Sequence, residues 1–252
     1  MKPSLLFALL LPLAAPALAA EPLRLTPMPP AETGLEAFPR LAEAEDAPSQ
    51  KINQALAAAD ERGRAAAASC RKDLRESGAD PHGAGWTRTV RVAMRGPAFL
   101  SVTAADEIYC GGPHPDAALF ALAYDLRTGS PLNWERLMPK ALSGKASLTS
   151  AADGTRLGVL TSPKLRALYL KASKPDAECA QALEGDELPL MLWPDAQAGG
   201  VAIQPADLPH VIAACGPAAI IPVAVLRPMG VDGGLLDAIE AAHKAGNFGK
   251  PR

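Results

Sequence analysis

The chain has little of what marks nucleic-acid-binding and membrane-bound proteins. Aromatic residues make up 4% of its 252 residues, and 25 basic residues against 27 acidic ones leave a formal net charge of −2. The charges are dispersed, and no basic stripe or charge block stands out along the chain. Binding to nucleic acid or to an anionic membrane surface relies on concentrated positive charge. We therefore expect no nucleic-acid partner and no stable membrane insertion of the processed chain.

Sequence signatures of catalysis and metal binding are also missing. There is no C-x-x-C, H-E-x-x-H or G-x-S-x-G motif. His210 and Cys215 are five residues apart, which does not place them on one face of a helix. We predict no metal site and no cofactor, and we assign no catalytic residue. Carboxylate pairs for glycoside cleavage stay open, because their separation in space leaves no sequence signature.

The one long apolar run lies at the N-terminus. It extends from Leu5 to Ala15 after the positive charge of Lys2, and Ala17-Leu18-Ala19 supplies a small-x-small cleavage pattern. This arrangement is typical of a signal peptide, which we place at residues 1–19. The alternative is an uncleaved membrane anchor, but the run is short for a helix that spans a bilayer. We expect a periplasmic or secreted protein.

Four cysteines, an even number, are present in this exported chain, and they predict two disulfides. Three pairings are possible. We favour Cys70–Cys110 with Cys179–Cys215, because each bond then joins neighbouring segments within one half of the chain. A four-cysteine metal site is the alternative, and the absence of C-x-x-C spacing speaks against it.

The N-terminal half predicts a proline-rich extended segment over residues 20–33 and then a long helix capped by Ser49. Apolar residues recur on one face of that helix at steps of three and four, and Cys70 lies on this face. Alternating residues predict a strand over Thr87–Arg95, followed by strands over Phe99–Cys110, with a bend at Asp106, and Ala118–Leu126. A turn with Gly129 at positive φ follows.

In the C-terminal half, the sequence predicts a short helix capped by Asn133, a loop over Ser143–Asp153, and helices over Leu157–Ala172 and Asp176–Leu183. A hairpin of strands Leu188–Trp193 and Gly200–Ile203 follows, then a strand over Ala219–Leu226 and a last helix over Leu235–Ala245. Helices and strands are segregated rather than regularly alternating. We therefore predict an α+β fold, an antiparallel sheet with a long N-terminal helix packed on it, stapled by disulfides.

One stretch carries a resemblance to a known family. The segment Tyr109-Cys110-Gly111-Gly112-Pro113-His114-Pro115, followed by Tyr124-Asp125-Leu126-Arg127-Thr128-Gly129, resembles an exported domain of unknown function. That domain forms the extracytoplasmic part of the anti-sigma-V factor RsiV and a non-catalytic part of the peptidoglycan deacetylase PdaC. The resemblance implies such a domain over residues 34–228, in an N-terminal part (34–105) and a C-terminal part (106–228), with a C-terminal helix and tail over 229–252.

The chain departs from the family pattern in two places. Cys110 stands where the family has a threonine-like residue, and the insert from Gly144 to Glu187 is long. The chain also has no deacetylase domain, sigma-binding part or internal transmembrane helix, so we expect neither deacetylase nor anti-sigma activity. The resemblance still implies an exported location and recognition of cell-envelope material.

The Gly-Gly loop with its histidine is the candidate ligand-binding site. We assign weak ligand-binding roles to Gly111, Gly112, His114 and Asp116, because glycines let a ligand approach the backbone. The alternative is that the glycines serve only the turn and His114 caps it. Asp125, Thr128 and Gly129 are assigned to turn geometry.

These features predict a non-catalytic envelope-binding module that recognises a cell-wall glycan, such as peptidoglycan, or a muramidase-type (lysozyme-like) protein. The alternative is a hydrolase that modifies an envelope polysaccharide with acidic residues and His114. A purely structural accessory protein, with no ligand, is the third possibility.

Overall fold

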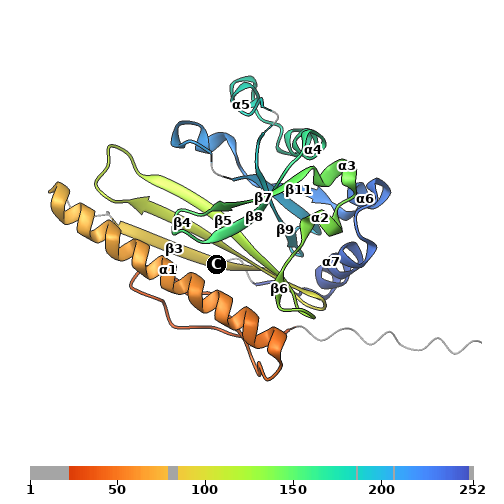
Figure 1. Cartoon of the computed structure of the whole chain (residues 1–252), viewed down its shortest axis with the longest axis horizontal. Helices are drawn as coiled ribbons and strands as arrows, with labels where there is room; N and C mark the ends of the chain where they lie inside the picture. Colours follow the sequence, from red (N-terminus) through yellow and green to blue (C-terminus); the bar gives the residue numbers. More distant parts are fainter. Residues whose placement is uncertain (1–22, 79–84, 186, 207, 250–252) are drawn as a thin grey trace, which may run out of the picture.

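The computed structural model describes residues 23–78, 85–185, 187–206 and 208–249, and the predicted signal peptide lies outside them. The described chain has the predicted α+β fold, with antiparallel sheets and a long helix (Figure 1). It also has the two predicted disulfides. A small sheet pairs β1 (Leu25–Thr26) with β2 (Arg40–Leu41). The four-stranded sheet has the order β3 (Gly85–Arg95), β4 (Phe99–Tyr109), β5 (Asp116–Asp125) and β6 (Ser130–Pro131). The five-stranded sheet has the order β11 (Ala219–Pro222), β10 (Gly200–Pro205), β9 (Leu190–Asp195), β8 (Arg156–Thr161) and β7 (Lys145–Ser150).

The long helix α1 (Ala47–Ser77) begins two residues before the predicted cap. Asp46, not Ser49, is the N-cap, and its carboxylate accepts a hydrogen bond of 2.7 Å from the Ser49 backbone N–H. The helix can start ahead of Pro48 because proline is tolerated in the first turn, where its missing N–H has no partner to lose. The predicted apolar face is confirmed, and its buried members include Ile52, Leu56, Ala59, Cys70 and Leu74.

The three strands predicted for this sheet are present as β3, β4 and β5, with shifts at their ends, but the predicted bend at Asp106 is wrong. Asp106 lies in an unbroken ladder, opposite Arg88 on β3 and Ala118 on β5. The irregularity lies instead between Val92 and Met94, where the register of β3 shifts. Aspartate is rare inside strands, which is why the sequence predicts a bend at Asp106. Its buried partner, Arg88, explains why it lies within a strand.

Two predictions in the C-terminal half are wrong. Ser143–Asp153 is not a loop but contains β7, whose residues are mostly exposed and so show no apolar alternation. The first residues of the predicted helix Leu157–Ala172 form β8, and the helix α4 (Pro163–Ser173) starts after its cap Ser162. Leu157 and Val159 are buried while Gly158 is exposed, which is the two-residue period of a strand.

The predicted strand Ala219–Leu226 is only half correct. It pairs as β11 up to Pro222 and continues as the short helix α6 (Val223–Leu226), because proline cannot donate to a ladder. The other predicted elements are present with small shifts at their ends. They are the hairpin strands β9 and β10, with α2 (Trp134–Leu137), α5 (Ala177–Ala182) and α7 (Gly233–Ala245). The chain also has the short segments α3 (Lys140–Ser143), η1 (His210–Cys215) and η2 (Arg227–Met229).

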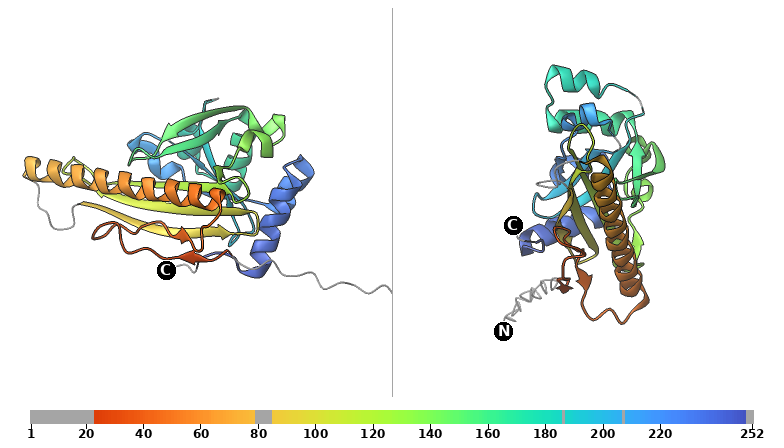
Figure 2. Two further views of the ribbon diagram at one scale, coloured as in Figure 1. Left: turned by 60° about the horizontal axis from the view of Figure 1, so that its bottom comes forward. Right: turned by 90° about the vertical axis from the view of Figure 1, so that its left-hand side faces the viewer.

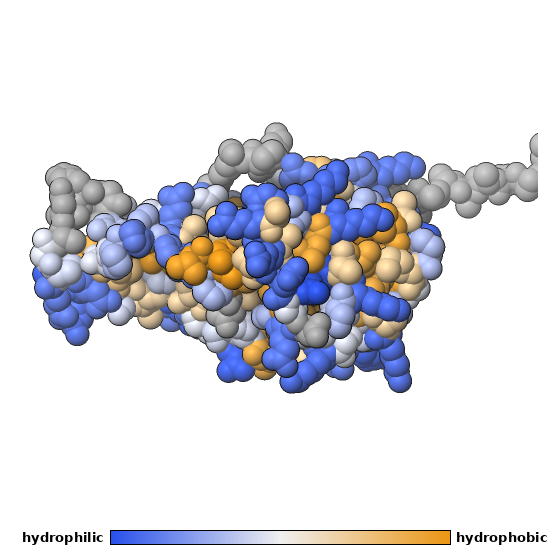
Figure 3. Space-filling view, turned by 90° about the horizontal axis from the view of Figure 1, so that it is seen from above, coloured by the Kyte–Doolittle hydropathy of each residue, from blue (hydrophilic) through white to orange (hydrophobic). Residues whose placement is uncertain are grey.

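The elements form four layers, which can be followed in Figures 1 and 2. Helix α1 covers one face of the four-stranded sheet, and the five-stranded sheet packs on its other face through Met191 and Trp193. Helices including α4 and α7 bury the outer face of the five-stranded sheet, with Leu165, Tyr169 and Leu235 in their core. The surface seen in Figure 3 carries several groups of hydrophobic residues between hydrophilic ones.

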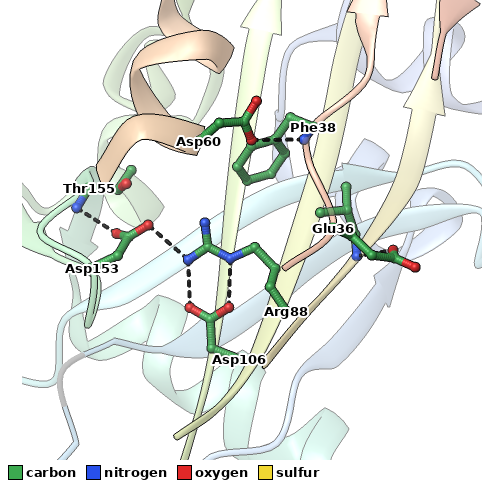
Figure 4. Close-up of polar contacts among 8 residues, drawn as sticks. Glu36, Phe38, Asp60, Arg88, Asp106, Asp153 and Thr155 are labelled. Carbon is green, nitrogen blue, oxygen red and sulfur yellow. Dashed lines mark hydrogen bonds and ion pairs between the residues drawn. The ribbon is translucent and has the colours of Figure 1, made fainter. Parts of the chain in front are cut away.

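Arg88 lies at the junction of α1, the four-stranded sheet and the β7–β8 turn (Figure 4). Its guanidinium makes a two-pronged contact with Asp106, at 2.6 Å from Nε and 2.7 Å from Nη2, and a 2.8 Å contact with Asp153 in the turn. All three side chains are almost fully buried. The guanidinium also lies 5.8 Å and 5.0 Å from the ring centres of Phe38 and Phe120. Charge-assisted pairs of this geometry are strong and directional.

The backbone of α1 packs closely against the Arg88 guanidinium at Gly63. A Cβ atom on Gly63 would lie 2.7 Å from Nη1 of Arg88, so the helix can pass at this distance only with glycine there. On the same helix, Asp60 accepts a hydrogen bond of 2.9 Å from the Phe38 backbone N–H and pairs with Arg40 at 2.5 Å. These contacts fix the helix, the N-terminal segment and the sheet against one another.

Burial and charge act against each other in this cluster. Burial alone would lower the pKa of Arg88, but the hydrogen bonds and charges of Asp106 and Asp153 outweigh it and raise that pKa. Burial raises the pKa of Asp106 by more than Arg88 lowers it, and the neighbouring charge of Asp153 adds to the rise. The arginine therefore stays charged, and its charge opposes the rise that burial causes in the pKa of Asp106.

Replacing Arg88 by methionine should lower the free energy of unfolding by about 3–5 kcal/mol at neutral pH, because two buried carboxylates lose their counter-charge. Without the guanidinium the pKa of Asp106 rises further. A carboxylate with a raised pKa stabilises the fold below its unfolded pKa, and this contribution is lost as pH rises through the folded pKa. The deficit relative to wild type should therefore shrink from about pH 7 towards about pH 4.

Urea unfolding of both proteins across this range measures the difference. The control is Arg64→Met, which removes an exposed pair with Glu61 and should change stability by less than about 1 kcal/mol. A deficit that is small at neutral pH, or that grows as pH falls, would contradict this account of the cluster.

Candidate functional site

The predicted loop joins β4 to β5 at the far end of the hairpin, next to the C-terminal end of α1 (Figure 1). Gly111 has φ +88°, and a Cβ there would lie 2.3 Å from the Ser77 Oγ, so the close approach to α1 requires glycine. Gly112 has open space around its Cα and no positive φ. The disulfide Cys70–Cys110, predicted from the sequence, ties the start of this loop to α1. Gly111 therefore has a structural reason to be glycine, and Gly112 has none.

The structure brings His114 and Asp116 together with a third residue, His210. The two imidazole rings are parallel within 7°, with their centres 6.1 Å apart. Nδ1 of His210 lies 3.2 Å from Oδ1 of Asp116, and both side chains are about half exposed. The sequence does not predict His210 as part of this site, because its partner Asp116 lies 94 residues away along the chain.

His210 belongs to η1, which the second predicted disulfide, Cys179–Cys215, holds to α5. Between η1 and the ends of β3, β4 and β5 lies a groove of about 790 Å³, here called the tip groove. Its lining residues are Gly85, Thr87, Glu107, Ile108, Tyr109, Pro115, Asp116, Ala117, His210, Ala213 and Ala214. Each wall of the tip groove is thus held by a disulfide, one next to Gly111 and one at the end of η1.

The tip groove contains several side chains that can form hydrogen bonds. Glu107 and Asp116 contribute carboxylates, Thr87 a hydroxyl, His210 an imidazole and Tyr109 an aromatic ring with a hydroxyl. Such groups can bind the hydroxyl and amide groups of a polar ligand, with the ring available for stacking. Within the ranges that the structure describes, no three His, Cys, Asp or Glu residues are grouped so that they could hold a metal ion.

The residues assigned to turn geometry have that role. Oδ1 of Asp125 accepts hydrogen bonds from the backbone N–H groups of Arg127, at 2.8 Å, and Thr128, at 3.2 Å. Gly129 has φ +65°, as predicted, and a Cβ there would lie 2.4 Å from the Pro48 carbonyl oxygen. The turn therefore fits against the first turn of α1 and lies away from the tip groove.

Comparison with known proteins adds little to this geometry. No protein-family model matches the chain, and no curated protein is similar to it. Among solved structures, a DUF3298 family protein from Pseudomonas aeruginosa PAO1 is a distant neighbour, with 15% sequence identity and a TM-score of 0.39. The match covers 60% of this chain and 63% of that protein, so this chain spans less than two thirds of its length. Among the described residues, no helix is both long and apolar enough to cross a bilayer.

Replacing both Cys179 and Cys215 by alanine should lower the free energy of unfolding by about 2–4 kcal/mol, because the unfolded chain loses a long covalent loop. It should also free η1, which has no fully buried residue of its own. Hydrogen exchange at residues 210–215 should become faster by a larger factor than exchange in β4, which reports only the change in global stability.

The matched control is the double replacement of Cys70 and Cys110, which should loosen the β4–β5 loop without affecting η1. Equal exchange rates in η1 before and after removal of Cys179–Cys215 would show that packing, rather than the disulfide, holds this wall.

Proposed function

We propose that this protein is an exported, non-catalytic module that binds a cell-wall glycan in the tip groove. The observation that carries the proposal is the convergence of Asp116, His210 and Tyr109 on one open groove with disulfide-held walls. Held side chains lose little freedom on binding, which favours recognition of a flexible ligand. The two disulfides are typical of proteins in oxidising compartments and support a periplasmic or secreted location.

The sequence resemblance to the RsiV and PdaC domain supports the same choice, because its motif is the loop that borders the tip groove. Two ligand classes followed from that resemblance, a glycan and a muramidase-type protein. The groove supports the glycan, because its carboxylates, hydroxyl and imidazole lie beside an aromatic ring, a combination that suits the hydroxyl groups and ring faces of a sugar.

A second candidate is a hydrolase that acts on the same polymer. It rests on the presence of two carboxylates, Glu107 and Asp116, in one groove, since glycoside cleavage uses such a pair. The two candidates share a ligand but differ in whether the polymer is cut.

The proposal predicts that purified protein with intact disulfides co-sediments with peptidoglycan sacculi. Asp116→Asn and His210→Ala should each weaken retention about tenfold or more, because a charged hydrogen-bonding group contributes about 1.5–3 kcal/mol. Asp237→Asn is the matched control, since it removes the same charge from α7 on the surface outside the groove and should leave retention unchanged.

Release of soluble fragments from labelled sacculi in the same samples distinguishes the two candidates. Retention without release supports the binding module, and release that Asp116→Asn abolishes supports the hydrolase. Wild-type protein that stays in the supernatant, or variants that all sediment like wild type, would contradict a glycan site in the tip groove.

A further inference from the structure

A second groove lies on the side of the molecule, between α1, the outer edge of β5, the β7–β8 hairpin and α2. It has a volume of about 510 Å³ and is here called the side groove. Most of its lining is apolar, with Leu122, Trp134, Leu157, Met191 and Leu192 as its large members. It forms because β6 pairs only with the last two residues of β5, so the rest of that edge has no neighbouring strand.

Small residues keep the side groove open. Ala55 and Ala58 line it from α1, and Gly158 lines it from β8. A Cβ on Gly158 would meet no atom within 4 Å, so a larger residue would fit there. Opposite Gly158 in the hairpin, Leu148 also lines the groove and is 63% exposed. Apolar surface of this kind, left open to water, is typical of a binding site.

All the charged residues that line the side groove are cations: Lys51, Arg62 and Arg156. Within the described chain none of the three pairs with a carboxylate, whereas Arg40, Arg88 and Arg91 each contact an aspartate. Arg62 donates from Nε to the Thr155 hydroxyl at 3.1 Å, and Lys51 donates to the Ser130 hydroxyl at 2.8 Å. Their charges therefore remain available to an anion.

Lys51, Ala55, Ala58 and Arg62 follow one line along α1, at steps of four, three and four residues. Lys51 and Arg62 are eleven positions apart in the helix, a distance of about 16 Å along its axis. One wall of the groove is thus a narrow apolar strip with a positive charge at each end. An extended apolar chain with an anionic head group matches this strip better than a compact ligand.

Tyr124 adds a hydrogen-bond donor near Arg62. It is 4% exposed, lines the side groove, and its hydroxyl has no hydrogen-bond partner among the residues described. Burial raises its pKa to about 12, while the charge of Arg62 acts in the opposite direction. The hydroxyl therefore keeps its proton at neutral pH. The hydroxyl is not among the fully buried polar atoms that lack a partner, so it is open to the groove and can donate a hydrogen bond to a bound anion.

We propose that the side groove binds a fatty acid, with its alkyl chain along the apolar strip and its carboxylate at Arg62 and Tyr124. This site is separate from the tip groove and does not depend on glycan binding. The recognition is non-covalent: burial of the alkyl chain supplies affinity, and the unpaired cations select the charged head group.

Titration of the full processed chain with dodecanoate tests the proposal, with Trp134 as a reporter. Bromine-labelled dodecanoate should quench tryptophan fluorescence saturably, and unlabelled dodecanoate should displace it. Dodecanol, which has the same chain without the charge, should bind at least tenfold more weakly.

Two variants locate the site. Gly158→Leu should fill the groove and weaken binding at least tenfold, and Arg62→Gln should weaken dodecanoate binding while leaving dodecanol unchanged. The matched controls are Gly112→Leu, which also has open space but lies in the β4–β5 loop, and Arg64→Gln, an exposed arginine of α1. Unchanged sacculus retention in Gly158→Leu would confirm that the two sites are independent and that the variant is folded.

Three results would overturn the proposal. They are the absence of saturable quenching below millimolar dodecanoate, equal affinity for dodecanol and dodecanoate, and unchanged binding in Arg62→Gln. Because Arg62 is partly exposed and its replacement creates no cavity, this last variant tests the site even if Gly158→Leu does not fold.

Discussion

Arg88 is the point at which three parts of the chain are held to one another. Asp106 lies on the neighbouring strand, Asp153 lies in the β7–β8 turn, and Gly63 makes room for the guanidinium on α1. A buried ionic cluster adds little net stability compared with apolar packing, but its charged groups must be held in one arrangement. The position of the β7–β8 hairpin over the edge of β5, and with it the shape of the side groove, follows from that geometry.

The tip groove depends on a different constraint. The β4–β5 hairpin and the end of α1 extend beyond the five-stranded sheet, as Figure 1 shows. Glu107 and residues 112–117 are exposed there, so apolar packing cannot fix their positions. Cys70–Cys110 and Cys179–Cys215 supply covalent links at the two walls instead. This explains why, in a protein with two apolar cores, each disulfide includes a cysteine next to a lining residue of the tip groove, Tyr109 or Ala214.

Local patterns in the sequence predicted α1, β3, β5, the Gly129 turn and the cysteine pairing, because each depends on periodicity or on neighbouring segments. Arg88 and Asp106 could have been found as well, since each stands among the apolar residues of its strand with opposite charge. β7 could not, because an exposed edge strand has no apolar alternation. His210 reaches Asp116 across 94 residues of chain, and only the arrangement of the two sheets brings them together.

Glycan binding in the tip groove is what distinguishes this interpretation from a purely structural role. Amide NMR of the labelled chain, titrated with a soluble peptidoglycan tetrasaccharide, tests it directly. Chemical shifts should change together to saturation and centre on Tyr109, Asp116 and residues 210–214, with β11 and α7 unaffected. Saturable shifts centred on another face, or a spectrum unchanged at millimolar ligand, would contradict it.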